Sequence, residues 1–131
     1  MRYIVFLHFF LCSSIVQAAS IVSADADNYR ELLTRLEPGD TLLLQPGVYK
    51  KGLPVHRLHG NRDKPVIIMG SPNGALPVFS ARPGHNTISM FKASYIVIRN
   101  LELDGRGIAG DGVKCEGTSD WAQHITLEIS I

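Results

Sequence analysis

The stretch that decides the fold is EPGDTLLLQPGVY, residues 37–49. Three leucines at 42–44 form a short apolar run between two turn signals, Pro38-Gly39-Asp40 and Pro46-Gly47. A second apolar pair, Val48-Tyr49, follows the second turn at once. Strands this short, closed firmly on both sides by turn residues, favour a fold in which the chain bends at regular corners.

The rest of the chain repeats this pattern of short strands and tight turns. Three runs rich in valine and isoleucine begin at Val66, Ile96 and Ile125, so they recur every 29–30 residues. A β-sandwich would use longer strands joined by hairpins. A repeat of this length instead predicts one coil of a parallel β-helix with two or three strands. The other predicted strands are 77–79, 88–91, 101–103 and 113–115, and the polar segment 54–65 is predicted to be a loop.

One helix is predicted, at about 27–36, just before the first leucine run. Tyr29, Leu32, Leu33 and Leu36 have the spacing of one apolar helix face. The open end of a solenoid exposes unpaired backbone groups, which a polar-faced cap protects. We therefore expect an all-β chain, the N-terminal rungs of a right-handed parallel β-helix from about residue 41, with an amphipathic capping helix.

The first 18 residues have the pattern of a secretory signal peptide. Arg2 precedes an apolar run of about ten residues, which is followed by small residues and the cleavage signature Val16-Gln17-Ala18. The run is too short to span the roughly 30 Å of membrane hydrocarbon. We expect residues 1–18 to be removed, which leaves a β-helix domain at 19–131 in a secreted or periplasmic protein.

Composition narrows the range of partners. The chain has 13 Lys and Arg against 12 Asp and Glu, and loss of Arg2 brings the charge to about zero. Without a basic field, neither nucleic acid nor, after signal removal, a membrane is an expected partner. Cys115 is the single cysteine after residue 18, so no internal disulfide is expected. The pattern does not indicate an oligomeric state.

The order of these motifs resembles the N-terminal part of secreted β-helix proteins of the pectate-lyase-like superfamily, in particular chondroitinase-B-like and alginate-lyase-like polysaccharide lyases. The resemblance covers roughly residues 25–128 and includes DKPVIIMG at 63–70 and SYIVIRNLELDG at 94–105. It implies an acidic polysaccharide as partner and cleavage by β-elimination. The family's catalytic groups lie on later rungs, so no residue here inherits those roles. The chain ends within or just after a strand, which suggests a fragment or a truncation.

Two aspartates in a glycine-rich segment are candidate metal ligands. Asp104 and Asp111 lie in LELDGRGIAGDGVKC, and carboxylates on a flexible loop suit Ca²⁺. The spacing matches no EF-hand loop, and both residues precede a glycine, so the alternative is that they form turns. Two histidines at 56 and 59 are weaker metal candidates, because no partnering motif accompanies them.

Trp121 and His124, in SDWAQHITLE, are candidates for substrate binding. An aromatic ring on an outer loop can stack against sugar, although His124 could equally pack at a corner between coils. A lyase also needs a base and a group that neutralises the uronate carboxylate. Lys114, Arg106, Arg99 and His124 are available, but no two of them form a recognisable pair.

The leading hypothesis is a fragment of a secreted polysaccharide lyase whose catalytic rungs are missing, so that this chain alone is expected to be inactive. The alternative is a non-catalytic β-helix module that binds carbohydrate or acts as an adhesin. A third is a non-functional truncation. The sequence encoded downstream of residue 131 and an assay for unsaturated uronate products would discriminate among these hypotheses.

Overall fold

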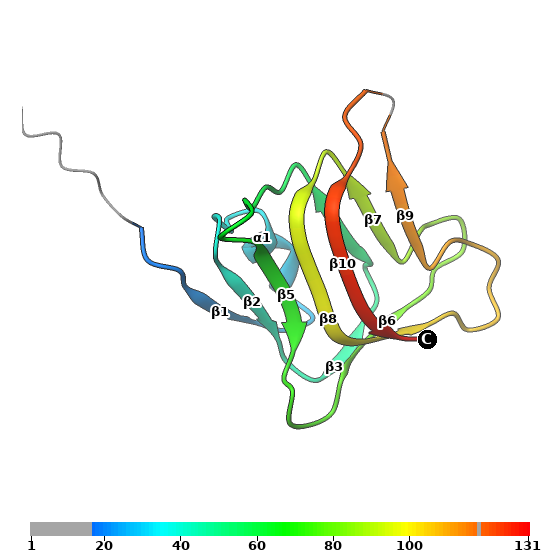
Figure 1. Ribbon diagram of the computed structural model, residues 1–131. Coiled ribbons are helices and arrows are strands. Elements are labelled where there is room, and N and C mark those ends of the chain that lie inside the picture. Colours follow the sequence, from blue (N-terminus) through cyan, green and yellow to red (C-terminus); the bar gives the residue numbers. More distant parts are fainter. Residues whose placement is uncertain (1–16, 118) are drawn as a thin grey trace, which may run out of the picture.

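The computed structural model describes residues 17–117 and 119–131, so most of the predicted signal peptide lies outside the described residues. Within these residues, ten strands and one short helix wind into a coil (Figure 1). The elements are β1 (Ile21–Ala24), α1 (Tyr29–Leu33), β2 (Thr41–Leu44), β3 (Gly47–Tyr49), β4 (Leu53–His56), β5 (Val66–Gly70), β6 (Pro77–Ser80), β7 (Ile88–Phe91), β8 (Ser94–Asp104), β9 (Val113–Glu116) and β10 (Gln123–Ser130). No helix of the described part is long and apolar enough to cross a membrane.

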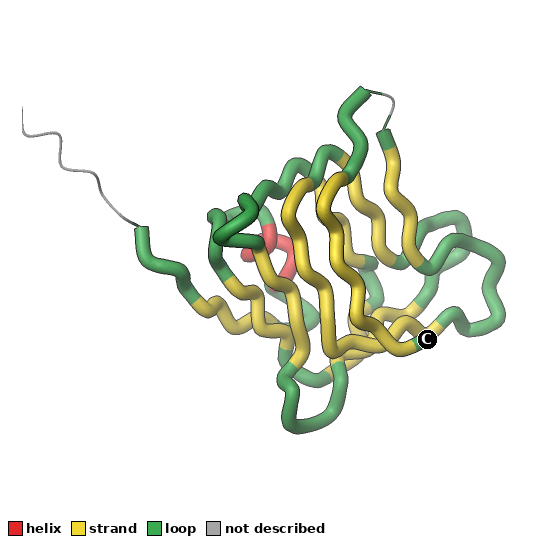
Figure 2. Tube along the Cα trace, viewed as in Figure 1, coloured by secondary structure: helices red, strands yellow, loops and turns green. Residues whose placement is uncertain are grey.

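Every paired strand runs parallel to its neighbour on the next coil. Figure 2 shows these strands side by side on successive turns of the coil. Strands β1, β2, β5, β8 and β10 lie side by side, β3 and β6 continue the same sheet beyond β8, and β4, β7 and β9 form a second sheet. Val66 pairs with Ile96 and Ile96 pairs with Ile125, which confirms the repeat of 29–30 residues. The repeat is thus one turn of the coil.

Strand β8 bends in the middle, so its two halves pair with different strands of the sheet. Its first half pairs with β5 and its second half with β6, and Asn100 at the bend has a left-handed backbone, φ 52°. Gly70 lies beside this corner on the preceding coil, where an added Cβ would be 2.2 Å from the Asn100 carbonyl oxygen. The two strands predicted at 95–98 and 101–103 are therefore one continuous strand.

Two strands were not expected from the sequence. Strand β4 occupies part of the segment predicted as a loop, and its inward residues Leu53 and Val55 are buried. Strand β1 pairs with β2, so the coils begin at Ile21 and not at about 41. Helix α1 covers only five residues of the expected 27–36.

The core lies inside the coil and against α1. In β2, Leu42 and Leu44 are fully buried while Leu43 is half-buried, as inward and outward alternation requires. Tyr29 and Leu33 of α1 are buried, and the helix contacts β1, β2 and β4. The expected apolar face of the helix thus packs on the first coil.

Candidate functional site

An open groove of about 450 Å³ lies over the outer face of the β4-β7-β9 sheet. Its floor is built by outward side chains at matched positions of the three strands. Pro54, Ser89 and Lys114 form one row, because the strand register aligns them. One end of the groove is formed by α1 and by the turns that lead into β4 and β7.

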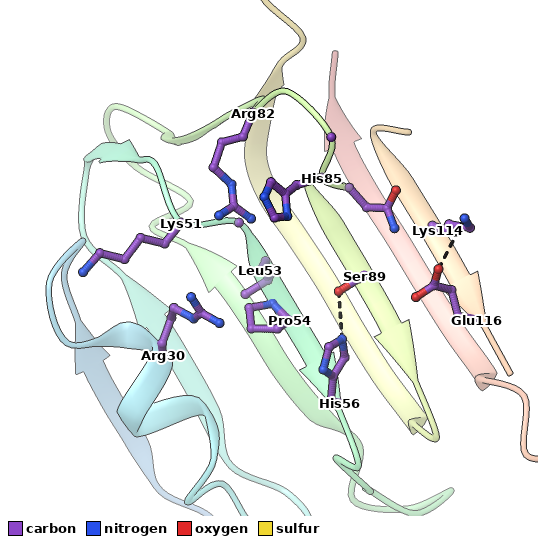
Figure 3. Close-up of a pocket in the computed structure, with 13 residues that line it drawn as sticks. Arg30, Lys51, Leu53, Pro54, His56, Arg82, His85, Ser89, Lys114 and Glu116 are labelled. Atoms are coloured by element: carbon purple, nitrogen blue, oxygen red, sulfur yellow. Dashed lines mark hydrogen bonds and ion pairs between the residues drawn. The ribbon is translucent and has the colours of Figure 1, made fainter. Parts of the chain in front are cut away.

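Basic side chains converge at that end of the groove. Arg30 comes from α1, Lys51 precedes β4, and Arg82 and His85 precede β7. Figure 3 shows the guanidinium groups of Arg30 and Arg82 directed toward the space above Leu53, whereas Lys51 extends away from it. Among the described residues, no carboxylate lies within 4.0 Å of these arginines or of Lys51. The end of the groove therefore carries uncompensated positive charge.

A glycine makes room for one of these arginines. An added Cβ at Gly52 would lie 2.9 Å from Nη2 of Arg82 and 3.0 Å from the Thr87 carbonyl oxygen. Gly52 also has φ 68°, a conformation that side chains rarely adopt. Its carbonyl accepts a hydrogen bond from the buried Tyr29 hydroxyl, which ties the turn to α1.

The middle of the groove holds a histidine. Nε2 of His56 and the Ser89 hydroxyl lie 2.8 Å apart on the neighbouring strands β4 and β7. The contact is diagonal, because Ser89 is the register partner of Pro54 and His56 is that of Phe91. Partial burial of the ring lowers the pKa of His56 from its ordinary value, with Arg57 and Arg30 adding to the decrease and Glu116 opposing it. His56 therefore becomes cationic only at a lower pH than a free histidine.

At the far end of the groove the cation lies beside carboxylates. Nζ of Lys114 lies 3.3 Å from a Glu116 carboxylate oxygen and 3.7 Å from an Asp111 oxygen (Figure 3 shows the first of these pairs). Positive charge is thus concentrated at the α1 end. A cleft lined with charge of one sign focuses its field and attracts ligands of opposite charge.

The structure separates the two predicted substrate-binding residues. His124 lines a second cavity, where its ring stacks on Tyr95 with centroids 4.3 Å apart. Trp121 is 57% exposed and lines neither this cavity nor the groove.

The predicted metal ligands have other partners. The Asp104 carboxylate accepts a hydrogen bond from the backbone N–H of Arg106, and Asp111 lies near Lys114. Within residues 17–117 and 119–131, no three histidine, cysteine or acidic side chains cluster as a metal site would require.

The groove residues Arg30, Lys51, Arg82 and His85 were missed in the sequence. They lie in a helix and in two turns that are far apart along the chain. Recognition of β4 as a strand would have aligned the turn at Lys51 with the turn before β7, because both turns lead into the same sheet. That alignment is the signal in the sequence that could have brought Lys51 close to Arg82 and His85.

No family model and no curated protein matches the chain. Solved structures do. The PL6 family alginate lyase AlyGC matches with a TM-score of 0.62 and 19% identity, over 82% of this chain and 14% of that one. An alginate lyase from Paenibacillus sp. strain FPU-7 matches with a TM-score of 0.59 and 20% identity, over 84% and 36%. A mannuronic acid specific polysaccharide family 6 lyase from human gut microbiota matches with a TM-score of 0.58 and 16% identity, over 82% and 25%.

These matches show that the chain has a fold like that of part of such lyases, and its coil of parallel strands is compatible with the β-helix that the motif order predicted. The chain spans between 14% and 36% of the length of these three proteins. A shared fold does not by itself fix a shared chemistry.

Proposed function

We propose that the groove over the β4-β7-β9 sheet binds an acidic polysaccharide. The observation that carries this proposal is the pair of arginines, Arg30 and Arg82, that point into one end of the groove. Neither has a carboxylate beside it in the part of the chain that the structure describes. A guanidinium presents two parallel N–H donors to a carboxylate, which suits the regularly spaced carboxylates of a uronate chain. The open shape of the groove suits a polymer better than a small enclosed ligand.

We further propose that the chain is part of a secreted polysaccharide lyase that cleaves uronate chains by β-elimination. In that reaction a base removes the proton α to the carboxyl group, the bond to the leaving sugar oxygen breaks, and a carbon–carbon double bond forms. A cation that neutralises the carboxylate makes the proton more acidic. The likeness to three alginate lyases and the basic groove support this proposal.

A second candidate is a module that binds the polymer without cleaving it. The two basic groups on the floor of the groove favour this candidate, because both already have partners. His56 is hydrogen-bonded to Ser89, and Lys114 is near two carboxylates. A base that is held in this way is poorly placed to accept a proton from substrate.

Calcium at Asp104 and Asp111, and export with cleavage before Ala19, stay predictions. Binding of calcium to the chain, measured by calorimetry and lost in the D104N/D111N variant, would test the first. N-terminal sequencing of the exported chain would test the second.

The test of the proposed function measures binding and cleavage together. The full chain is titrated calorimetrically with alginate, polygalacturonate and chondroitin, and the ultraviolet absorbance of unsaturated uronates is followed in the same samples. Loss of one charge-assisted hydrogen bond predicts that Arg82→Gln weakens binding about tenfold. Lys50→Gln, which removes an exposed cation outside the groove, should change the affinity less than about twofold.

The outcomes separate the candidates. Binding with release of unsaturated products supports the lyase, and binding without products supports the module. Equal affinity of the chain and Arg82→Gln for all three polymers would refute the groove as the binding site.

A further inference from the structure

A second cavity, of about 520 Å³, lies over a different sheet from the basic groove. It is found where the chain turns into β5, β8 and β10, and it shares no lining residue with the groove. Tyr95 and His124 form one wall, and Arg62, Pro65 and Thr126 contribute to the rest. We call this cavity the aromatic pocket.

The two rings stack because they occupy the same corner on successive coils. Ser94 pairs with Gln123, so the next residues, Tyr95 and His124, lie beside each other. Both have left-handed backbones, with φ 54° and 52°, so both side chains leave the corner in the same direction. Their ring planes differ by only 10° at a centroid distance of 4.3 Å. The repeat of the coil thereby builds an aromatic wall.

On the preceding coil the same corner carries no side chain. The N–H of Gly60 donates a hydrogen bond to the Ser94 carbonyl at 2.8 Å, which places Gly60 beside Tyr95. An added Cβ there would lie 2.6 Å from the Tyr95 carbonyl oxygen, so only glycine fits. The aromatic column therefore consists of two rings.

The remaining walls supply one cation and one hydroxyl group. Arg62 is exposed on the loop before β5, and no carboxylate lies within 4.0 Å of its guanidinium among the described residues. Thr126 is exposed and directed outward from β10, next to Val97 of β8. The pocket thus combines an apolar aromatic wall, a free guanidinium and a hydroxyl within one cavity.

We propose that the aromatic pocket is a second carbohydrate site, which holds one acidic sugar unit. The C–H face of a pyranose ring would pack against this stacked pair, on a ring face that the other ring leaves uncovered, while its carboxylate accepts hydrogen bonds from Arg62. A nucleotide fits less well, because its phosphate is usually held by several cations or by a cluster of backbone N–H groups. This site goes beyond the proposed groove and would give the protein a second contact with the same polymer, which raises its avidity.

The test is an NMR titration of the ¹⁵N-labelled full chain with trigalacturonate and with its methyl ester, which keeps the sugar rings but removes their charge. We expect amide shifts to change around Arg62, Tyr95 and His124. Arg62→Gln should weaken trigalacturonate binding at these amides about tenfold and leave binding of the methyl ester unchanged. Arg82→Gln is the matched control, which should affect only the amides of the basic groove.

A second variant tests the aromatic wall and is chosen so that the chain still folds. His124→Asn removes the ring but tolerates a left-handed backbone, and it should weaken both ligands at the pocket by about threefold or more. The inference is overturned if shifts change only at the groove, if Arg62→Gln binds trigalacturonate as the parent chain does, or if uridine monophosphate binds the pocket more tightly. Shifts at the pocket without shifts at the groove would instead refute the proposed groove function.

Discussion

The first coils and the last coil carry the same pattern of side chains but bury it very differently. In the second sheet, Met90 of β7 is fully buried, whereas its register partner Cys115 of β9 is exposed. In the first sheet, Ile98 of β8 is fully buried, whereas its partner Leu127 of β10 is 39% exposed. Each pair has the same inward position in its own strand.

This difference shows that the direction of a side chain and its burial have separate causes. Alternation along a strand decides which side chains point inward. Burial also requires a coil on both sides, and within the described structure β9 and β10 each have a strand partner on one side only. Because buried apolar area contributes most of the stabilising free energy, we expect stability to be concentrated in the first coils.

The largest expected effect comes from the aromatic cluster of the first coils. Phe79 is fully buried, stacks on Tyr49 at 4.8 Å and meets Tyr29 edge-on at 5.8 Å. Phe79→Ala should lower the free energy of unfolding by about 3–5 kcal/mol, because it leaves a cavity in a packed core. Leu127→Ala on the last coil should cost less than about 1 kcal/mol, since the side chain is already partly solvated. Urea denaturation followed by circular dichroism measures both.

The fluorescence of Trp121, just before β10, adds a local probe to the same experiment. If the last coil is weakly held, Trp121 should report unfolding at a lower urea concentration than circular dichroism does. Equal costs for Phe79→Ala and Leu127→Ala would contradict the comparison of the two regions.

The sequence could predict the parts of the fold that repeat. Strands β5, β8 and β10 were found because Val66, Ile96 and Ile125 recur at the length of one coil and their runs are apolar. Strand β4 was missed because Pro54 and His56 made a short strand look like a polar loop. Strand β1 was missed because its four residues, Ile21–Ala24, show no alternation of apolar and polar side chains. Of these residues, which pair with β2, only Ala24 is fully buried.

The candidate site was harder to predict than the fold. Its basic side chains lie in a helix and two turns, where no periodicity constrains residue type, and only the coil brings them together. His124 was predicted to bind substrate because its ring lies near Trp121 in the sequence and could stack against sugar. Its actual neighbour, Tyr95, lies one repeat earlier and follows from the strand register. Register is thus the information that sequence-based site prediction lacked.

A smaller effect on stability is expected at Asp40, the residue before β2. Its side chain links the start of β2 to Ser20, the residue before β1. Its carboxylate accepts hydrogen bonds from the Ser20 N–H at 2.9 Å, the Ser20 hydroxyl at 2.7 Å and the Glu37 N–H at 2.8 Å. Burial alone would raise the pKa of Asp40, but these hydrogen bonds outweigh it and lower the pKa. Asp40→Ala should therefore cost about 2 kcal/mol of stability at neutral pH.

The pH dependence of this effect has a definite sign. Because the native state holds the pKa of Asp40 below its ordinary value of 3.8, its stabilisation is complete above that value and declines as the pH falls toward the native pKa. The difference in unfolding free energy between the parent chain and Asp40→Ala should thus narrow in acid. Asp63→Ala, at an exposed aspartate, should change stability by no more than about 0.5 kcal/mol. A gap that stays constant down to pH 2 would contradict this account of Asp40.

The smallest expected effect on stability is at Cys115, and it tests the comparison between coils most directly. Cys115→Ser should change the free energy of unfolding by no more than about 0.5 kcal/mol, because the thiol is exposed. In the native chain, Cys115 should react with a maleimide nearly as fast as in urea. A cysteine placed at the partner position by Met90→Cys, in a Cys115→Ser background, should react only when the coil opens, since the Met90 side chain is fully buried. Equal native reactivity of the two thiols would show that the first and last coils are equally open, and the difference in burial would then not govern stability.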